Sequence, residues 1–464
     1  MTDAEYRASL ERLYQRRRFG MAPGLEVIRT LLTELGEPQH AFRAIHVTGS
    51  KGKGSVAAMA AAILTASGRR TGLFTSPHLV SYRERMQIDR VPIDPDAVAA
   101  GVQKVEAAAD RLERSGSISR APTFFEVTTA VAFDWFRSQG VRDAVVEVGL
   151  GGRLDSTNVI DAPVGVITTI ELEHTEVLGP TLTDVAREKA GILHPDMHGI
   201  VGERKDEPVR EIARHAATLG VHLTHLGREI EVRDRTLSPR GQSMTIVTPH
   251  RTLARAEVHL HGSFQARNAA LAVAATEEYL RAQDAKVSDA VLRKGLAHAA
   301  WRGRLERIDR RPDLFVDVAH TPESAQALAE SLGEIAPFEE PDDNVIVFGC
   351  LADKPLARIL EALEPLSHTL VVVPVRSERG ADPGDIRRAA VGRFRRIVLA
   401  PDAERGLSLA RAATAADGFT LVVGSDYLVG EILRAREGAP ADEPDLSDPG
   451  RGGPPTPTVK VGAR

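Results

Sequence analysis

Residues 41–68 read AFRAIHVTGSKGKGSVAAMAAAILTASG, and this stretch decides the fold class. The apolar run at 41–48 is typical of a buried strand, and the run that starts at Val56 ends at Gly68, as helices often end at glycine. Between the two runs lies the loop Gly49-Ser50-Lys51-Gly52-Lys53-Gly54-Ser55. A strand, a glycine-rich turn and a helix in this order open a parallel α/β unit.

The alternation of strands and helices continues along the first part of the chain. We expect strands at 70–74, 143–148 and 164–169, and helices at 124–138 and 182–190. The segment from about 200 to 261 differs, because runs such as EIEVRDRTL and SMTIVTP alternate in the manner of antiparallel strands. We interpret this segment as a β-rich insertion of the first domain.

A second α/β pattern begins after the segment WRGRLE at 301–306. The last 27 residues of the chain contain six prolines and five glycines. This composition cannot form a core, so we expect a disordered tail. The predicted domains are 1–299 and 300–437, with the tail at 438–464. The second domain is expected to be a Rossmann-like doubly wound sheet with strands at 314–318, 345–348, 369–373, 396–399 and 420–423.

The charges of the chain exclude some classes of protein. The 464 residues include 59 lysines and arginines against 64 aspartates and glutamates, so the basic excess of a general nucleic-acid or membrane-surface binder is missing. The single cysteine, Cys350, rules out an internal disulfide and a cysteine-based metal cluster. The first residues lack a signal-peptide pattern, and no run of about eighteen apolar residues predicts a membrane helix. We therefore expect a cytoplasmic protein.

The loop at 49–55 has the features of a phosphate-binding loop. Its glycines let backbone N–H groups converge on a phosphate at the positive end of the following helix. Lys53 is placed to reach the β- and γ-phosphates of a nucleotide, and Ser55 offers a hydroxyl ligand for Mg²⁺. Only two residues separate Gly49 from Gly52 and Lys53, where the usual Walker pattern has four. This is therefore a shortened loop, with an ordinary glycine-rich turn as the alternative.

Two further strand ends carry groups that suit a metal ion. Glu147 lies at the end of an apolar run, at the edge of an α/β sheet where binding sites form, and its carboxylate suits Mg²⁺. His174 follows the strand expected at 164–169, and it is compatible either with a metal ligand or with a histidine that has no chemical role. Lys189, taken alone, reads as an exposed helical lysine.

The first strand of the second domain ends in FVDVAHTPES at 315–324. Asp317 suits a ribose hydroxyl, and His320 suits the phosphates of a nucleotide. Arg304, between the domains, is able to reach a developing phosphoryl charge when the domains close. An ordinary βα turn is the alternative interpretation of this group.

Together these motifs resemble the Mur ligase superfamily and, within it, the folylpolyglutamate synthase and dihydrofolate synthase family. The resemblance runs from about residue 46 to 433, in the family's order of motifs. The Gly-Ser ending of the loop and the segment SPHLVSYRERMQI are typical of the folate branch. The motifs are HVTGSKGKGSVAAM, GLFTSPHLVSYRERMQI, TFFEVTT, EVGLGGRLDSTNVI, EHTEVLG, REKAGI, GSFQARNAALA, WRGRLE, DVAHTPES and GSDYLVGEIL.

The resemblance implies a fold, cofactors and site residues. The fold is an N-terminal Mur ligase domain of the P-loop type followed by a C-terminal ligase domain, and the cofactors are ATP and Mg²⁺. One Mg²⁺ would be held by Ser55 and Glu147, and a second by His174 and a carbamylated Lys189. The catalytic set is Lys53, His174, Lys189, Arg304 and His320. The ATP contacts are Gly49, Ser50, Lys51, Gly52, Lys53, Gly54, Ser55, Asn268, Arg304, Asp317 and His320. The substrate contacts are Ser76, Pro77, His78, Phe124, Arg153 and Asp155.

Four positions bear on this assignment. Phe124 and Phe125 either pack a flat pterin ring or belong to the core of the helix that follows. Glu173 stands where the family usually has aspartate, which keeps the charge on a longer arm. Thr321 stands where many bacterial relatives have asparagine.

The resemblance implies an ATP-dependent ligase that joins L-glutamate to dihydropteroate, to reduced folates, or to both. The acceptor carboxylate attacks the γ-phosphate of ATP, and the amine of glutamate then displaces phosphate from the acyl phosphate. Lysine and metal charge offset the repulsion between the anionic groups. A Mur-type ligase with another acid acceptor and a non-catalytic nucleotide-binding switch are the alternatives. The expected partners are small molecules, and we expect a monomer because relatives are commonly monomers.

Overall fold

The predicted strand at 41–48 forms part of an eight-stranded sheet in the computed structural model, which describes residues 3–16, 24–238, 240–336 and 340–438. The strands of this sheet are β1 (Arg43–Thr48), β2 (Thr71–Phe74), β3 (Met86–Ile88), β4 (Val91–Pro92), β5 (Asp143–Glu147), β6 (Asp161–Ile167), β7 (His198–Val201) and β8 (His222–His225). Their order is β4-β3-β2-β5-β1-β6-β7-β8, and all neighbours from β2 to β8 are parallel. A parallel strand is buried on both faces, so its sequence is a continuous apolar run, which made β1 and β5 predictable.

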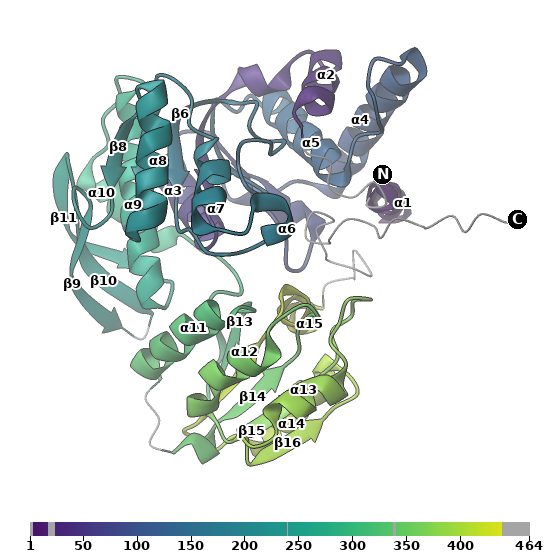
Figure 1. The fold of residues 1–464 in the computed structure, drawn as a ribbon, viewed down its shortest axis with the longest axis vertical. Helices are drawn as coiled ribbons and strands as arrows, with labels where there is room; N and C mark the ends of the chain where they lie inside the picture. Colours follow the sequence, from purple (N-terminus) through teal and green to yellow (C-terminus); the bar gives the residue numbers. More distant parts are fainter. Residues whose placement is uncertain (1–2, 17–23, 239, 337–339, 439–464) are drawn as a thin grey trace, which may run out of the picture.

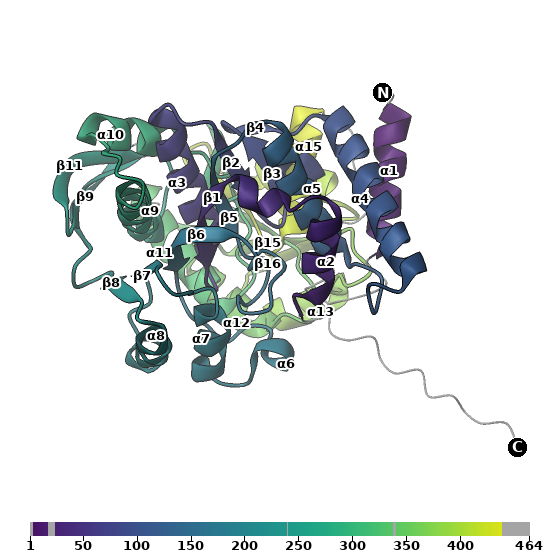
Figure 2. The same cartoon turned by 90° about the horizontal axis from the view of Figure 1, so that it is seen from above.

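Helices cover both faces of this sheet (Figures 1 and 2). One face packs on α3 (Lys53–Ala66), α9 (Ser263–Arg281) and α10 (Asp289–His298). The other face packs on α1 (Asp3–Gln15), α2 (Glu26–Glu34), α4 (Pro95–Ser115) and α5 (Phe124–Ser138). The remaining helices of this body are α6 (Thr175–Leu178), α7 (Leu182–Ala190) and α8 (Asp206–Leu219), with 3-10 turns η2 (Pro38–Ala41) and η3 (Tyr82–Arg85). The predicted helices at 124–138 and 182–190 are confirmed as α5 and α7.

The segment from 200 to 261 is only partly the predicted β-rich insertion. Its first part continues the parallel sheet through β7, α8 and β8. The antiparallel part is a three-stranded sheet of β9 (Glu231–Ser238), β10 (Gly241–Thr248) and β11 (Arg251–Val258). Sequence alternation identified only this second part, because alternation requires one exposed sheet face, whereas four-residue strands such as β7 and β8 are too short to show their pairing.

The second α/β pattern forms a six-stranded sheet, the green to yellow body in Figure 1. Its strands are β12 (Glu306–Asp309), β13 (Asp313–Asp317), β14 (Val345–Phe348), β15 (Thr369–Val372), β16 (Arg396–Leu399) and β17 (Phe419–Val423). The order is β12-β13-β17-β14-β15-β16, parallel except for β12, so the doubly wound sheet is confirmed. Its helices are α11 (Pro322–Ile335), α12 (Leu356–Leu363), α13 (Pro383–Ala390), α14 (Ala403–Ala413) and α15 (Asp426–Glu437), with 3-10 turns η4 (Pro341–Asp343) and η5 (Glu364–Leu366).

Residues 299–305 connect the two bodies between α10 and β12. The bodies also meet where β9 reaches α11, because Nη2 of Arg235 donates to Oε2 of Glu334 at 2.7 Å. The predicted tail at 438–464 lies, apart from Gly438, outside the described residues. Within the residues that the structure describes, no helix combines the length and the apolar character needed to cross a membrane.

A buried polar group ties α9 to the start of β1 and β5. The hydroxyl of Tyr279 lies 3.0 Å from the carbonyl oxygen of Arg43 and 3.0 Å from Oδ1 of Asp143. Asp143 also accepts from Nη1 of Arg69 at 2.7 Å. Burial and the neighbouring Asp143 both raise the pKa of Tyr279, so the hydroxyl stays protonated and remains a donor.

We predict that Tyr279→Phe lowers the free energy of unfolding by about 1–3 kcal/mol, because it leaves a buried carboxylate with one donor fewer. Urea denaturation of the wild type and the variant measures the difference. A change below about 0.5 kcal/mol, the size of an ordinary surface substitution, would contradict this role for the hydroxyl.

Candidate active site

The loop after β1 comes so close to its neighbours that only glycine fits at two positions. Gly49 has φ +141°, and a β-carbon there would lie 1.8 Å from Oγ1 of Thr168. Gly52 has φ +90°, precedes α3, and a β-carbon there would lie 2.7 Å from Oδ1 of Asn268. The loop backbone at the positive end of α3 therefore lines the cavity without side chains to cover it.

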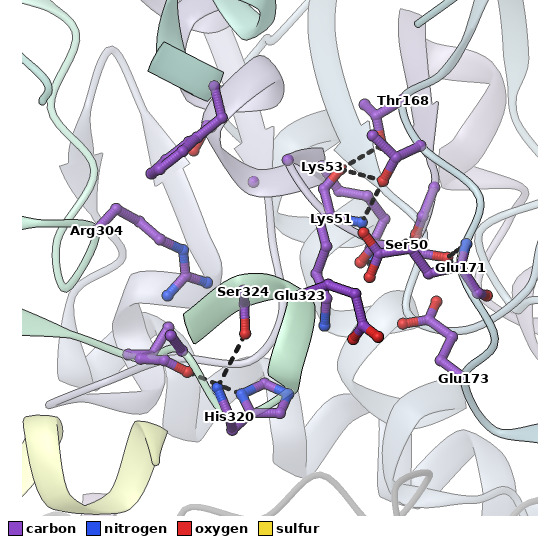
Figure 3. A pocket seen from close by; sticks show the side chains of 18 of the residues that line it. Ser50, Lys51, Lys53, Thr168, Glu171, Glu173, Arg304, His320, Glu323 and Ser324 are labelled. Carbon is purple, nitrogen blue, oxygen red and sulfur yellow. Dashed lines mark hydrogen bonds between the residues drawn. The ribbon is translucent and has the colours of Figure 1, made fainter. Parts of the chain in front are cut away.

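Two threonines that follow β6 hold this loop in place, and Figure 3 shows one of them, Thr168, beside the loop. The backbone N–H of Ser50 donates to the carbonyl oxygen of Thr169 at 2.7 Å. Lys51 donates from its backbone N to Oγ1 of Thr169 at 3.0 Å and accepts from Oγ1 of Thr168 at 2.7 Å. Because β1 and β6 are parallel neighbours, their carboxyl ends bring the loop and the threonines to the same sheet edge.

Lys53 and Ser55 lie in the first turn of α3. Nζ of Lys53 donates to the carbonyl oxygen of Gly49 at 2.8 Å. Oγ of Ser55 accepts from Nε2 of Gln265 at 3.2 Å, and Oε1 of Gln265 accepts from Nδ2 of Asn268 at 3.0 Å. The start of α9 therefore sets the orientation of the Ser55 hydroxyl.

Glu147 is buried at the end of β5. Its Oε2 accepts from the backbone N–H of Ser76 at 3.1 Å, and its side chain lines the same cavity as Ser55. The end of β2 is thereby connected to the end of β5, its neighbour in the sheet.

Lys189 is 1% exposed, which corrects the interpretation of this residue as an exposed helical lysine. Its Nζ donates to the carbonyl oxygen of Gly49 at 3.0 Å and to Oε1 of Glu173 at 3.0 Å. Burial raises the pKa of Glu173, but the charges of Lys189, Lys53 and Lys51 bring the net pKa well below its usual range. Glu173 therefore stays ionised.

His174, the next residue, has φ +48° and lines the cavity at the start of α6.

The second body contributes groups to the other side of the cavity (Figure 3). Asp317 ends β13, and its two oxygens accept from the backbone N–H groups of Leu305 and Ala319, each at 2.7 Å. Burial raises the pKa of Asp317 to about 6, although Arg304 and these two N–H groups oppose the shift. Nδ1 of His320 donates to the carbonyl oxygen of Val318 at 2.8 Å, which places a proton on that nitrogen.

One cavity between the two bodies brings together most of the predicted site residues. Those that line it are Gly49 to Ser55, Ser76, Pro77, Glu147, His174, Lys189, Asn268, Arg304, Asp317 and His320. Four predicted substrate contacts do not line it: His78, Phe124, Arg153 and Asp155.

Phe124 belongs to the core rather than to the cavity. It is fully buried, and its ring stacks on Tyr14 with the centroids 5.2 Å apart. Thr123 caps α5, and Phe124 is the first residue of this helix. The next residue, Phe125, is half-buried and packs against Gly149, where a β-carbon would lie 2.5 Å from its ring. The core interpretation of Phe124 therefore replaces the prediction of a substrate contact.

The other three residues shape loops. His78 is buried, and its Nδ1 accepts from Nε of Arg85 at 2.8 Å. Arg153 pairs with Glu188 at 2.8 Å on the surface. Asp155 accepts from the backbone of Leu150 at 2.9 Å and from Thr157, which fixes the turn after β5.

Some residues in or beside the cavity were not predicted. Gln265 is buried and holds the Ser55 hydroxyl without lining the cavity. It lies three positions before Asn268 on α9, and this helical spacing puts both on one face, so the pattern could have identified it. Lys354, Arg379 and Glu323 line the cavity from loops and a helix start of the second body. No pattern in the sequence distinguishes these three from ordinary surface charges.

The oxygen donors of the first body fit magnesium. Within the described residues, no three His, Cys, Asp or Glu side chains converge as a complete metal site. Glu147 and Ser55 are nevertheless both buried and place a carboxylate and a hydroxyl on the cavity that the phosphate-binding loop lines. Mg²⁺ is commonly held in this way, by one or two protein oxygens together with substrate phosphates and water.

Comparison with known proteins agrees with this arrangement. The Mur ligase middle domain matches residues 47–276, and the Mur ligase, glutamate ligase domain matches residues 303–426. The chain is 37% identical over 384 residues to the dihydrofolate synthase/folylpolyglutamate synthase of Mycobacterium tuberculosis, covering 80% of this chain and 78% of the relative. It is 30% identical over 423 residues to the Bacillus subtilis protein of the same name, covering 91% and 97%.

Solved structures agree with these sequence matches. The Mycobacterium tuberculosis folylpolyglutamate synthase complexed with ADP and AMPPCP has a TM-score of 0.85 and 34% identity, covering 93% of this chain and 98% of that one. The Escherichia coli FolC in complex with DHPP and ADP has a TM-score of 0.81 and 28% identity, covering 93% and 98%.

We predict that Gly49→Ala weakens nucleotide binding by at least about tenfold, because the loop must move away from Thr168. Gly68→Ala is the matched control, since Gly68 also has a positive φ, +85°, but no atom within 4 Å of its β position. Calorimetric titration with a nucleotide measures both. Equal affinities for the two variants would contradict the steric role of Gly49.

We also predict that nucleotide affinity falls as the pH decreases through about 6, where Asp317 takes up a proton. The raised pKa means that the carboxyl is protonated below this value, and a protonated oxygen becomes a donor facing a backbone N–H. Titration at one pH unit above and below the midpoint measures the change. Asp317→Asn should remove this pH dependence, and a variant that retains it would assign the effect to another group.

Proposed function

The chain belongs to the folylpolyglutamate synthase/dihydrofolate synthase family of the Mur ligase superfamily, and we propose that the protein adds L-glutamate both to dihydropteroate and to reduced folates. It is an ATP-dependent ligase of folate metabolism. The two relatives described above carry the names of both activities, which supports the choice of two acceptors.

One observation carries the proposal. A single cavity holds the phosphate-binding loop, Glu147 and Lys189 from the first body, Arg304 from the connecting segment and His320 from the second body. An acceptor carboxylate is a poor electrophile until it is phosphorylated, so it must approach the γ-phosphate of ATP although both are anionic. A cavity with cationic side chains from two bodies offsets that repulsion.

The side chains have distinct roles in this proposal. Lys53 and Arg304 stabilise the charge that develops on the transferred phosphoryl group. Ser55 and Glu147 would hold one Mg²⁺, which neutralises phosphate oxygens when bound. His174 and Lys189 would hold a second, with Lys189 carbamylated by CO₂ after it loses a proton. Asp317, with Asn268, would bind the nucleoside part of ATP.

Incoming glutamate is proposed to bind against the second body. Its carboxylates require cations near the reacting carbon, and Lys354 and Arg379 line the cavity there. Both contact Asp353, at 2.7 Å from Nζ of Lys354 and 3.2 Å from Nη2 of Arg379, so the two cations are held side by side. The amine of glutamate would then attack the acyl carbon, and phosphate would leave.

We further propose that the two domains span residues 1–299 and 300–437 and that the protein is a monomer. We also propose a cytoplasmic location, which is supported by the dependence on ATP. Small molecules are the partners that the cavity suits.

We predict that Lys53→Ala lowers kcat by roughly 10²–10³-fold, the usual loss when one charge-stabilising donor is removed. Steady-state phosphate release measures the rate, and nucleotide titration shows that the variant still binds. Turnover near that of the wild type would contradict the assigned role.

The proposed function is tested by phosphate release from ATP with Mg²⁺ and glutamate, with dihydropteroate and tetrahydrofolate supplied separately, and by mass spectrometry of the products. Both acceptors should be consumed, and each product should be heavier by one glutamyl unit. Turnover of one acceptor alone would reduce the proposal to a single activity. No turnover of either, with ATP still bound, would favour a Mur-type ligase that uses another acid.

A further inference from the structure

We propose that Leu79, together with Val80, is a positioning residue that couples the placement of the second body to Glu147 in the cavity, a role that presupposes the proposed function. Both residues lie in the segment 76–85 between β2 and β3, which we call the coupling loop. The loop belongs to the first body, but its two apolar side chains pack into the second.

The first residues of the coupling loop belong to the cavity. Ser76 and Pro77 line it. The backbone N–H of Ser76 donates to Oε2 of Glu147 at 3.1 Å, and both residues are buried. The position of Ser76 therefore sets the direction of a carboxylate that is proposed to bind Mg²⁺.

The rest of the loop is held rigid by its own side chains. Glu84 accepts from the backbone N–H groups of Leu79 at 2.8 Å and of Val80 at 2.9 Å. Arg85 is fully buried, donates to His78 at 2.8 Å, and lies 5.3 Å from the ring centre of Phe124. These contacts connect the tip of the loop to its base, so a displacement at Leu79 is transmitted to Ser76.

The tip of the loop lies in the core of the second body. Leu79 is 8% exposed, Val80 is 6% exposed, and both join the apolar cluster that β13, β14, β15 and β17 form with α14 and α15. Leu79 fits over Gly303, where a β-carbon would lie 2.8 Å from its Cδ1. The same position would lie 3.2 Å from Val318 and 3.3 Å from Val429. Gly303 thus forms a notch that receives Leu79.

The notch belongs to the turn at residues 303–305, which contacts the end of β13 and carries Arg304. The carbonyl oxygen of Gly303 accepts from the backbone N–H of Val318 at 3.1 Å, and Leu305 donates to Asp317 at 2.7 Å. Arg304 lies between these two contacts in the chain. One apolar contact, Leu79 in its notch, therefore links Glu147 on one side of the cavity to Arg304 and Asp317 on the other.

This arrangement has a functional consequence. When the second body is in place, Leu79 and Val80 are covered and the coupling loop holds Glu147. When the second body moves away, the two side chains lose their apolar cover, and the loop loses the contact that fixes its tip. Magnesium and nucleotide should therefore bind best when both bodies are in contact.

The first test is the affinity of the full chain for AMPPCP with Mg²⁺, measured by calorimetry without any acceptor. Leu79→Ala should weaken binding by about tenfold and raise the Mg²⁺ concentration at half-saturation. Leu79→Met, which keeps the volume, should restore both values. Because no folate is added, this result is independent of whether the proposed acceptors are turned over.

Val371→Ala is the control for a loss of core packing alone. Val371 is 1% exposed in the same apolar cluster, on β15, three strands from β13 in the sheet. The variant Val371→Ala should lower the melting temperature and leave the Mg²⁺ dependence of AMPPCP binding unchanged. If Leu79→Ala behaves like this control, Leu79 has only a packing role and the proposal is wrong.

A double-mutant cycle tests the notch itself. Gly303→Ala places a methyl group against Leu79, whereas the Leu79→Ala background leaves room for it. Gly303→Ala should therefore weaken binding more in the wild type than in that background, and the backbone strain at Gly303, φ +65°, cancels because it is present in both. Additive effects on affinity would show that the two residues do not meet in the working protein and would overturn the proposal.

Discussion

Three glycines of the phosphate-binding loop leave room for side chains from three other parts of the fold, and the rest of the site depends on this close packing. Thr168 comes from the neighbouring strand end at Gly49, Asn268 from α9 at Gly52, and Trp301 from the segment between the bodies at Gly54. A side chain at any of these positions would separate the loop from one part of the fold. Strand end, helix and connecting segment can therefore all pack against the loop only because it has no β-carbons at these points.

The charges around the loop are balanced within a small buried region. Lys189 is almost completely buried and is held by Glu173 and by a backbone oxygen of the loop. Burial raises the pKa of Glu171, whereas Glu173, which pairs with Lys189, is kept ionised. Glu173 thus has a clear electrostatic role as the ionised partner of Lys189. A site with these charges in place reorganises little when an anionic substrate arrives.

Much of the fold was predictable because its strands are buried on both faces and read as apolar runs. β14 and β16 were predicted to the residue, and α5 and α7 were too, but β12 was missed because ERID at 306–309 is a half-buried, polar edge strand. The loop glycines were predictable from chemistry, since few roles require three glycines and two lysines in seven residues. The burial of individual helical side chains was not predictable. Whether Lys189 and Phe124 are buried depends on which side of their helices faces the core, and only tertiary packing decides that.

Helix α9 is attached at both ends of the large sheet. Near its start, Gln265 and Asn268 reach Ser55 and the loop at the carboxyl edge, and near its end Tyr279 contacts Arg43 and Asp143 at the amino edge. The helix has 19 residues and spans roughly 28 Å. Contacts at both ends therefore fix the position of α9 along β1. Tyr279 does not line the cavity, so a substitution there would act on the loop only through the length of the helix.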